Sequence, residues 1–216
     1  MKTSKILIPP LALLALVSIA PGAKADNNNF YVLGSIGRSN ITTDSSSIDA
    51  LNLRDGFLSS TTTNNTTNDT GYKAQLGYRF GNFAIEGGYT DLGRSNFTSA
   101  TTNAANNTQY FYGDATTKLI NLDAVGYVPL GKNFSLLGRL GVYNWETDSN
   151  VPMPSGELSE ITDRGWDVKF GAGLQYDFND FFGLRAEFER YNGVGNNDTT
   201  GNSKVNLMSA GAVIKF

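Results

Sequence analysis

The chain has 216 residues, a length that suits one domain. It carries 17 basic and 20 acidic side chains, and this acidic balance argues against nucleic acid as a partner. It contains no histidine and no cysteine, which excludes disulfides, thiolate metal sites and reactions that depend on an imidazole base. Carboxylate-only chemistry stays open, although no pair of acids stands out for it. We therefore expect neither a cofactor nor a metal site.

The first 25 residues are typical of a cleaved secretory signal. Two lysines precede an apolar stretch at 6–20, and Ala23 and Ala25 are the small residues that a signal peptidase recognises. Cleavage is therefore expected before Asp26. An uncleaved membrane anchor is the less favoured alternative, because the apolar stretch is shorter than the roughly 20 residues of a spanning helix.

The remaining chain, residues 26–216, contains eight segments in which apolar and polar side chains alternate. Side chains on a strand point to opposite faces in turn, so this period of two predicts strands with one apolar face. The eight segments lie at 30–38, 72–80, 83–89, 120–128, 134–142, 166–176, 184–188 and 203–216.

The two faces of these strands differ in charge. The apolar faces carry no charged residue, whereas the opposite faces carry charges of both signs, which suits a narrow lumen with lipid outside. Only helices and closed barrels satisfy every backbone polar group in hydrocarbon. We predict an all-β fold, a closed eight-stranded antiparallel up-and-down transmembrane barrel in contact with outer-membrane lipid. The polar faces hold Lys73, Gln75, Arg79, Glu86, Asp123, Arg139, Asp167, Lys169, Gln175, Arg185 and Glu187.

Aromatic residues gather near both predicted ends of the strands. Such girdles mark the two interfaces of a membrane-spanning barrel. One predicted girdle holds Phe30, Phe80, Phe83, Phe134, Tyr176 and Phe216, and the other holds Tyr72, Tyr89 and Trp166.

The connections between the segments alternate in length. Short turns are expected at 80–83, 129–134 and 177–182, and such turns lie on the periplasmic side of outer-membrane barrels. The long links are rich in Asn, Thr and Ser, and we predict them to be four extracellular loops that could contact a host or another surface ligand. These loops are 39–70, 91–117, 146–163 and 192–202.

The last predicted strand ends in a motif that resembles the terminal strand of bacterial outer-membrane barrels. Ser209, Gly211, Ile214 and Phe216 fit the spacing polar, any residue, Gly, two residues, apolar, any residue, aromatic. In those barrels the barrel-assembly machinery reads this motif. The resemblance therefore implies that machinery as a partner during biogenesis.

With these strands placed, the chain resembles the transmembrane domain of the OmpA family. Residues 86–94, EGGYTDLGR, are similar to the family's third strand, and Arg139–Gly141 with Trp145 resembles its fifth. Residues 173–176 and 184–188 are similar to strands six and seven. The likeness covers about residues 29–216, and in size the chain is similar to small single-domain barrels such as OmpX.

The resemblance implies that lumen ion pairs plug the barrel and that one acid exchanges basic partners as a gate. Glu86 and Arg185 match that acid and one basic partner. Val125 stands at the alternative partner's position and Gln175 at an acid of the sixth strand, so a plug is better supported than a gate. Eight strands leave an interior that side chains fill, where buried charges must pair. The predicted lumen ion-pair network is Glu86, Asp123, Arg139, Lys169, Arg185 and Glu187.

These observations together favour a non-enzymatic outer-membrane barrel that serves envelope integrity or surface interaction. A small-solute pore is the alternative, and it requires a continuous wet path through the lumen. An enzyme with its site in the loops is less favoured, because the sequence offers no histidine and no nucleophile–base pair.

Overall fold

The computed structural model describes residues 29–43, 49, 53, 58–63, 67–102, 106–152, 158–195 and 203–216, and nearly all of them lie in strands. The predicted signal at 1–25 and its cleavage site lie outside the described residues. Within the described ranges, no helix is long and apolar enough to cross a membrane.

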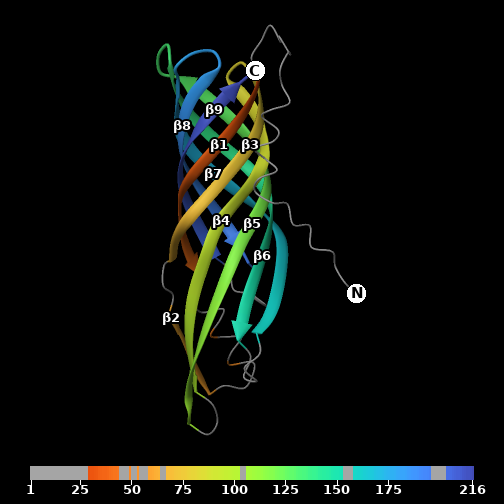
Figure 1. The fold of residues 1–216 in the computed structure, drawn as a ribbon, viewed down its shortest axis with the longest axis vertical. Helices are drawn as coiled ribbons and strands as arrows, with labels where there is room; N and C mark the ends of the chain where they lie inside the picture. The colour runs from red at the N-terminus through yellow and green to blue at the C-terminus, as the bar shows by residue number, and fades with distance from the viewer. Residues whose placement is uncertain are drawn as a thin grey trace, which may run out of the picture.

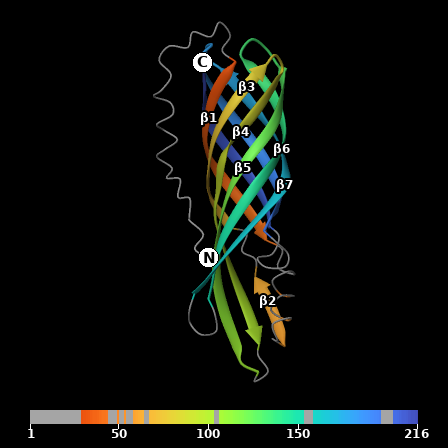
Figure 2. The ribbon, with the colours of Figure 1, turned by 90° about the vertical axis from the view of Figure 1, so that its right-hand side faces the viewer.

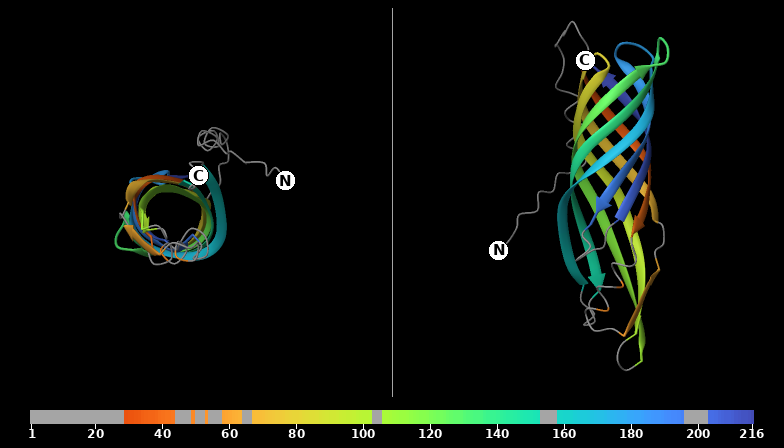
Figure 3. Two further views of the ribbon diagram at one scale, coloured as in Figure 1. Left: turned by 90° about the horizontal axis from the view of Figure 1, so that it is seen from below. Right: turned by 180° about the vertical axis from the view of Figure 1, so that it is seen from behind.

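Eight strands close into one antiparallel barrel (Figure 1). Viewed along its long axis, the barrel is a ring (Figure 3, left). Each strand pairs with its neighbours in sequence, and the β1–β9 pairing closes the ring, while β2 pairs only with the far end of β4. This confirms the predicted fold class. The strands of the described chain are β1 (Phe30–Thr43), β2 (Ser59–Thr63), β3 (Thr67–Phe80), β4 (Phe83–Thr102), β5 (Thr108–Pro129), β6 (Phe134–Pro152), β7 (Leu158–Asp177), β8 (Phe182–Val194) and β9 (Ser203–Lys215).

The strands are strongly staggered around the barrel. A row of paired residues that starts at Lys215 on β9 returns to the same strand at Val205, ten residues away. Such a stagger tilts the strands by roughly 40° and leaves an eight-stranded interior that side chains can fill. The row passes Tyr31, Gly77, Glu86, Asp123, Gly141, Lys169 and Tyr191 in turn.

The two faces of the barrel wall separate as the alternation predicts. On β3, the side chain of Leu76 is 55% exposed, whereas the neighbouring Gln75 is 1% exposed. On β6, Leu140 points outward and Arg139 is buried in the lumen. The outward apolar side chains form a continuous belt around the barrel, and the charges of the same strands lie inside. Polar inside and apolar outside is the arrangement of a barrel solvated by lipid.

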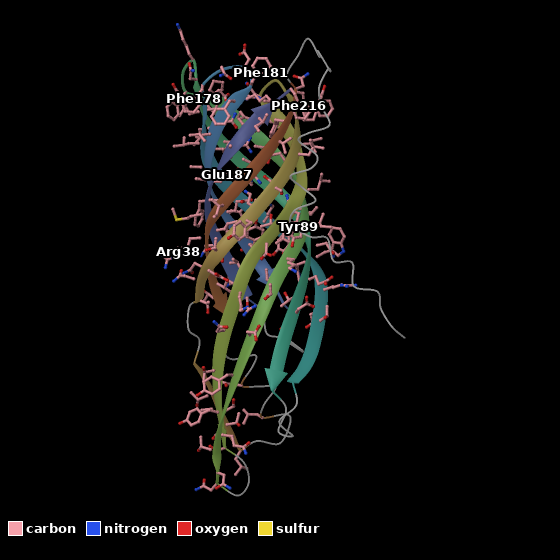
Figure 4. All side chains as sticks on the ribbon, in the orientation of Figure 1. Arg38, Tyr89, Phe178, Phe181, Glu187 and Phe216 are labelled. Carbon is pink, nitrogen blue, oxygen red and sulfur yellow. The ribbon has the colours of Figure 1, made fainter. Side chains whose placement is uncertain are left out.

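The three short turns lie at one end of the barrel, together with the start of β1 and the end of β9. We call this end the short-turn end. Figure 4 shows Phe178, Phe181 and Phe216 gathered there. The ring of Phe134 lies 4.9 Å from that of Tyr176, which lies 4.8 Å from that of Phe178. The aromatic girdle predicted for this end is therefore present. Gly81 occupies the tightest turn with a φ of 65°, a conformation that favours glycine.

The strands at the opposite end are longer than the sequence predicts, which corrects the expected loop boundaries. β4 and β5 continue through most of 91–117, and β6 and β7 continue through most of 146–163. The link 39–70 contains the end of β1, all of β2 and the start of β3, and β8 reaches three residues into 192–202, to Val194. We call the protruding parts of β4 to β7 (residues 94–102, 108–116, 146–152 and 158–164) the outer extension (Figures 1 and 2).

The extension was missed because polar side chains predominate on both of its faces, so its segments lack the sustained apolar alternation of the barrel. Its Thr-rich segments nevertheless suit strands, since β-branched side chains fit a pleated surface. The register of β4 on β5 shifts between Asp91 and Arg94, where Gly93 adopts a φ of 82°. This bulge lies where β4 leaves the barrel, which is a common place for a strand to bend.

Candidate functional site: the lumen plug

The middle of the lumen holds a balanced group of eight charged side chains. None of them is more than 6% exposed, and the four acids and four bases cancel in charge. Six consecutive strands, β3 to β8, contribute them, because the stagger carries inward-facing positions of these strands to one level. Figure 4 shows Glu187 in this middle zone, between Phe216 and Arg38. The group, here called the lumen plug, is Lys73, Glu86, Asp123, Arg139, Lys169, Arg185, Glu187 and Glu189.

Glu86 is held by two arginines at the same time. Arg185 Nη1 donates to Glu86 Oε1 at 2.6 Å, and Arg139 Nη2 donates to Glu86 Oε2 at 2.5 Å. The Tyr31 hydroxyl donates to Oε1 as well. Arg185 Nη2 also donates to the Tyr127 hydroxyl at 2.6 Å, which joins the plug to the aromatic side chains on its short-turn side.

A second set of contacts is centred on Glu189. Lys73 Nζ donates to Glu187 Oε2 at 2.7 Å and also to Glu189 Oε2. The other oxygen of Glu189 accepts from Lys169 Nζ at 2.8 Å and from Arg139 Nη1 at 3.1 Å. Three cations therefore surround this one carboxylate, which offsets the large cost of burying its charge.

Arg139 links the two sets, because it contacts all four acids of the plug. Its Nη1 donates to Asp123 Oδ2 at 3.0 Å, and the same oxygen lies 3.0 Å from Lys169 Nζ and accepts from Asn121. Its Nη2 lies 2.7 Å from Glu187 Oε1, a charge contact without the alignment of a hydrogen bond. A network that shares one guanidinium among several acids is strongly coupled, so its members act as a unit.

An apolar layer covers the plug on each side. On the short-turn side the buried layer is Tyr31, Leu33, Ala84, Val125, Tyr127, Leu137 and Val213. On the other side it is Ile41, Leu92, Leu119, Tyr143, Trp145, Tyr191, Val194, Val205 and Leu207. Apolar constrictions repel a water column, so the two layers separate the charged zone from both ends of the barrel.

The structure brings together all six residues of the predicted network. Two further members, Lys73 and Glu189, were not predicted. The alternation places Lys73 on the polar face, but the predicted network did not include it. Glu189 lies one residue beyond Phe188, where the predicted strand ends. Continuing the alternation by one residue would have placed Glu189 inside.

The predicted assembly motif is divided between the two faces of β9. Ser209 is buried toward the lumen, while Ile214 is on the lipid-facing side. The ring of Phe216 stacks on that of Phe30 with the centroids 6.5 Å apart, and its backbone N–H donates to the Phe30 carbonyl at 2.9 Å. A Cβ at Gly211 would lie 2.2 Å from the Gly34 carbonyl oxygen, so the strands meet closely there.

Residues 10–216 match the family described as outer membrane protein beta-barrel domain. Outer membrane protein A of Salmonella typhi and that of Shigella flexneri are 29% and 28% identical to the chain over 151 residues. The match covers 69% of this chain and 41% of those proteins, so it spans about two-fifths of their length. The crystal structure of Neisserial surface protein A aligns with a TM-score of 0.54 at 16% identity, covering 87% of this chain and 97% of that one, which shows the same barrel fold.

Proposed function

The chain belongs to the outer membrane protein beta-barrel family and resides in the outer membrane, and on that premise we propose that it is a sealed, non-enzymatic barrel that presents a surface for contact outside the cell. The observation that carries the proposal is the division of the molecule into a barrel closed by the lumen plug and a stranded extension beyond the lipid belt. In this proposal the barrel anchors the chain in the outer membrane, and the extension makes the contacts outside the cell.

The closed lumen argues against the pore alternative. A pore for small solutes needs a continuous wet path, but the charged zone lies between two buried apolar layers. Every charge of the plug has at least one partner of opposite sign within 3.1 Å. Opening a path would separate several of these pairs in a region of low dielectric, which is costly.

The same pairing argues against an enzyme in the lumen. Each acid of the plug is held by a guanidinium or an ammonium group, so none is free to accept a proton from a substrate. The chain contains no histidine to act as the base in place of these acids.

The outer extension carries the features expected of a contact surface. The side chains of Tyr110 and Tyr112 on β5 are 64% and 69% exposed, beside Ala100 and Thr98 on β4. Tyr110 lies ten residues beyond Ile120, the last outward apolar residue of the belt on β5, which places it roughly 30 Å farther along the strand. Exposed tyrosines so far from lipid are typical of residues that bind a partner.

The experiment compares bacteria that display the full chain with bacteria that display the Tyr110→Ser, Tyr112→Ser variant at equal surface levels. Attachment to cultured epithelial cells and to bacteria lacking the protein is counted. A control replaces Thr108 and Gln109, which are exposed polar residues at the same tip, with serine. We expect attachment above background that the tyrosine variant loses and the control keeps. Attachment equal to background for the unmodified chain contradicts the contact role.

A further inference from the structure

The lipid-facing wall of β8, β9 and β1 ends in three basic side chains. Arg190 on β8, Lys204 on β9 and Arg38 on β1 share the outward register at the outer edge of the apolar belt, where Arg38 is paired with Met208. No salt bridge joins any of them to another described residue. We call these three residues the basic patch. Figure 4 shows Arg38 at about the level of Tyr89, where the barrel gives way to the extension.

The register places the three cations around a row of amide side chains. Arg190 is paired with Asn206, and Asn206 is paired in turn with Asn40. By strand and residue spacing, the Cα atom of Arg190 lies roughly 8 Å from that of Lys204 and roughly 12 Å from that of Arg38. Long basic side chains can converge across such distances. Arg190 Nη1 also donates weakly to Asn206 Oδ1, at 3.5 Å.

The opposite side of the same rim has a different charge pattern. There Arg164 Nε lies 2.7 Å from Glu146 Oε2, and Arg94 Nε lies 3.8 Å from Asp114 Oδ2. Lys118 is paired in register with Glu146. Basic residues on that side therefore have acidic neighbours. On β8, β9, β1 and β3 the described acids, such as Glu189, instead lie on the inward face.

We propose that the basic patch binds the phosphate groups of an anionic lipid in the outer leaflet. Arg38 is paired in register with Met208, and Met208 is paired with Phe188. Both apolar side chains are exposed members of the apolar belt, and Arg190 and Lys204 lie farther out along their strands. A ligand that fills both surfaces must carry negative charge next to acyl chains, which is the chemistry of a phosphorylated lipid. Clusters of lysine and arginine at a membrane surface attract anionic head groups in this way.

A free anion or an acidic protein fits the site less well. Neither uses the apolar surface below the cations, and a soluble protein would have to approach the patch through the head-group layer. The amide NH2 group of Asn206, and the second N–H of Asn40 Nδ2, which donates once to Asn68 Oδ1 at 3.0 Å, offer further hydrogen-bond donors to phosphate oxygens. The site is thus suited to a lipid that lies against one side of the barrel.

The test uses the full chain purified from outer membranes in detergent and native mass spectrometry of its lipid complexes. The probes are diphosphorylated lipid A and, for comparison, phosphatidylcholine, each titrated into the protein. The variant Arg38→Gln, Arg190→Gln, Lys204→Gln is compared with the unmodified chain. We expect the affinity for lipid A to fall roughly tenfold or more, since each surface cation contributes to binding an anionic lipid. Binding of phosphatidylcholine should not change.

A matched control removes three cations from the opposite side of the rim, with Arg94, Lys118 and Arg164 changed to glutamine. These have acidic neighbours, so their loss should change lipid A affinity less than twofold. Heat-dependent gel mobility checks that every variant is folded. An equal loss in both triple variants, or no loss in the first, overturns the proposal. Displacement of lipid A by inorganic phosphate at millimolar concentration also overturns the proposal, because the site would then bind phosphate without any contribution from the acyl chains.

Discussion

Arg185 Nη1 and Glu86 Oε1 meet 2.6 Å apart in a part of the lumen that is buried from every side. The second oxygen of Glu86 is bound by Arg139 Nη2 at 2.5 Å, so both basic partners are in place together. An acid that switches between two basic partners binds only one of them at a time. Val125, at the position where the family's alternative partner would stand, belongs to the buried apolar layer instead. The geometry therefore favours a fixed plug over a partner-exchanging gate.

Replacing Arg185 with alanine should destabilise the barrel by about 3–5 kcal/mol, because it leaves a buried carboxylate without one of its cations. The free energy of unfolding is measured by urea titration in lipid vesicles, followed by tryptophan fluorescence. The double variant Glu86→Gln, Arg185→Ala should cost less than the sum of the single changes.

Arg164→Ala is the control for this cycle. Its ion pair with Glu146 has nearly the same length, 2.7 Å, but both side chains are largely exposed. Exposed pairs contribute about 0–1 kcal/mol, so this change should have little effect. Strictly additive costs for Glu86 and Arg185 would show that the two side chains are not coupled.

Leu140→Arg should cost about 2–4 kcal/mol, because it places a charge on the lipid side near the middle of the belt. Trp166→Arg is the depth control: Trp166 lies outward on β7 at the far edge of the belt, where the cost falls to about 0–1 kcal/mol. The same urea titration measures both. Equal costs at the two depths would contradict the assignment of the apolar belt to lipid.

The lumen glutamines are unsuitable as controls for that experiment. Gln175 Oε1 accepts from Arg185 Nε at 2.9 Å, and Gln75 lies against Arg139. An added arginine at either position would meet a cation already in the plug. This is a feature that the sequence does not reveal, since alternation gives the face of each residue but not its neighbours across the lumen.

The fold could be predicted because lipid outside and charge inside impose a period of two on each strand. The stagger of the strands could not be predicted from the sequence. It is this stagger that brings Lys73 Nζ on β3 within 2.7 Å of Glu187 Oε2 on β8. Glu189 was missed because the predicted strand ended at Phe188. The outer extension was missed because polar residues on both faces remove the alternation, although the backbone pairs in the same way.

Phe216→Ser should reduce the amount of assembled barrel in cells more than it reduces the stability of the refolded protein. Phe30→Ser is the matched control, since it removes the other half of the same stacked pair and leaves the chain-end motif intact. An aromatic pair contributes about 0.5–1.5 kcal/mol beyond its area, so the two variants should unfold at similar urea concentrations. Equal surface levels of both variants would argue against a recognition role for Phe216.

The folded chain should resist SDS at room temperature and change its gel mobility only after boiling. Its barrel strands are all paired around a closed ring, so the detergent finds no open edge from which to unzip the barrel. Samples with and without boiling are compared on one gel. Identical mobility in both would count against a closed barrel in solution.

Ion conductance of the purified, unmodified protein in planar lipid bilayers tests the sealed lumen most directly. Four acids paired with four bases between two apolar layers should exclude a continuous water column. We expect no stable conductance steps, or only brief and rare ones, over hours of recording at high salt. Stable, large steps from the unmodified chain would contradict the plug and establish the pore alternative in its place.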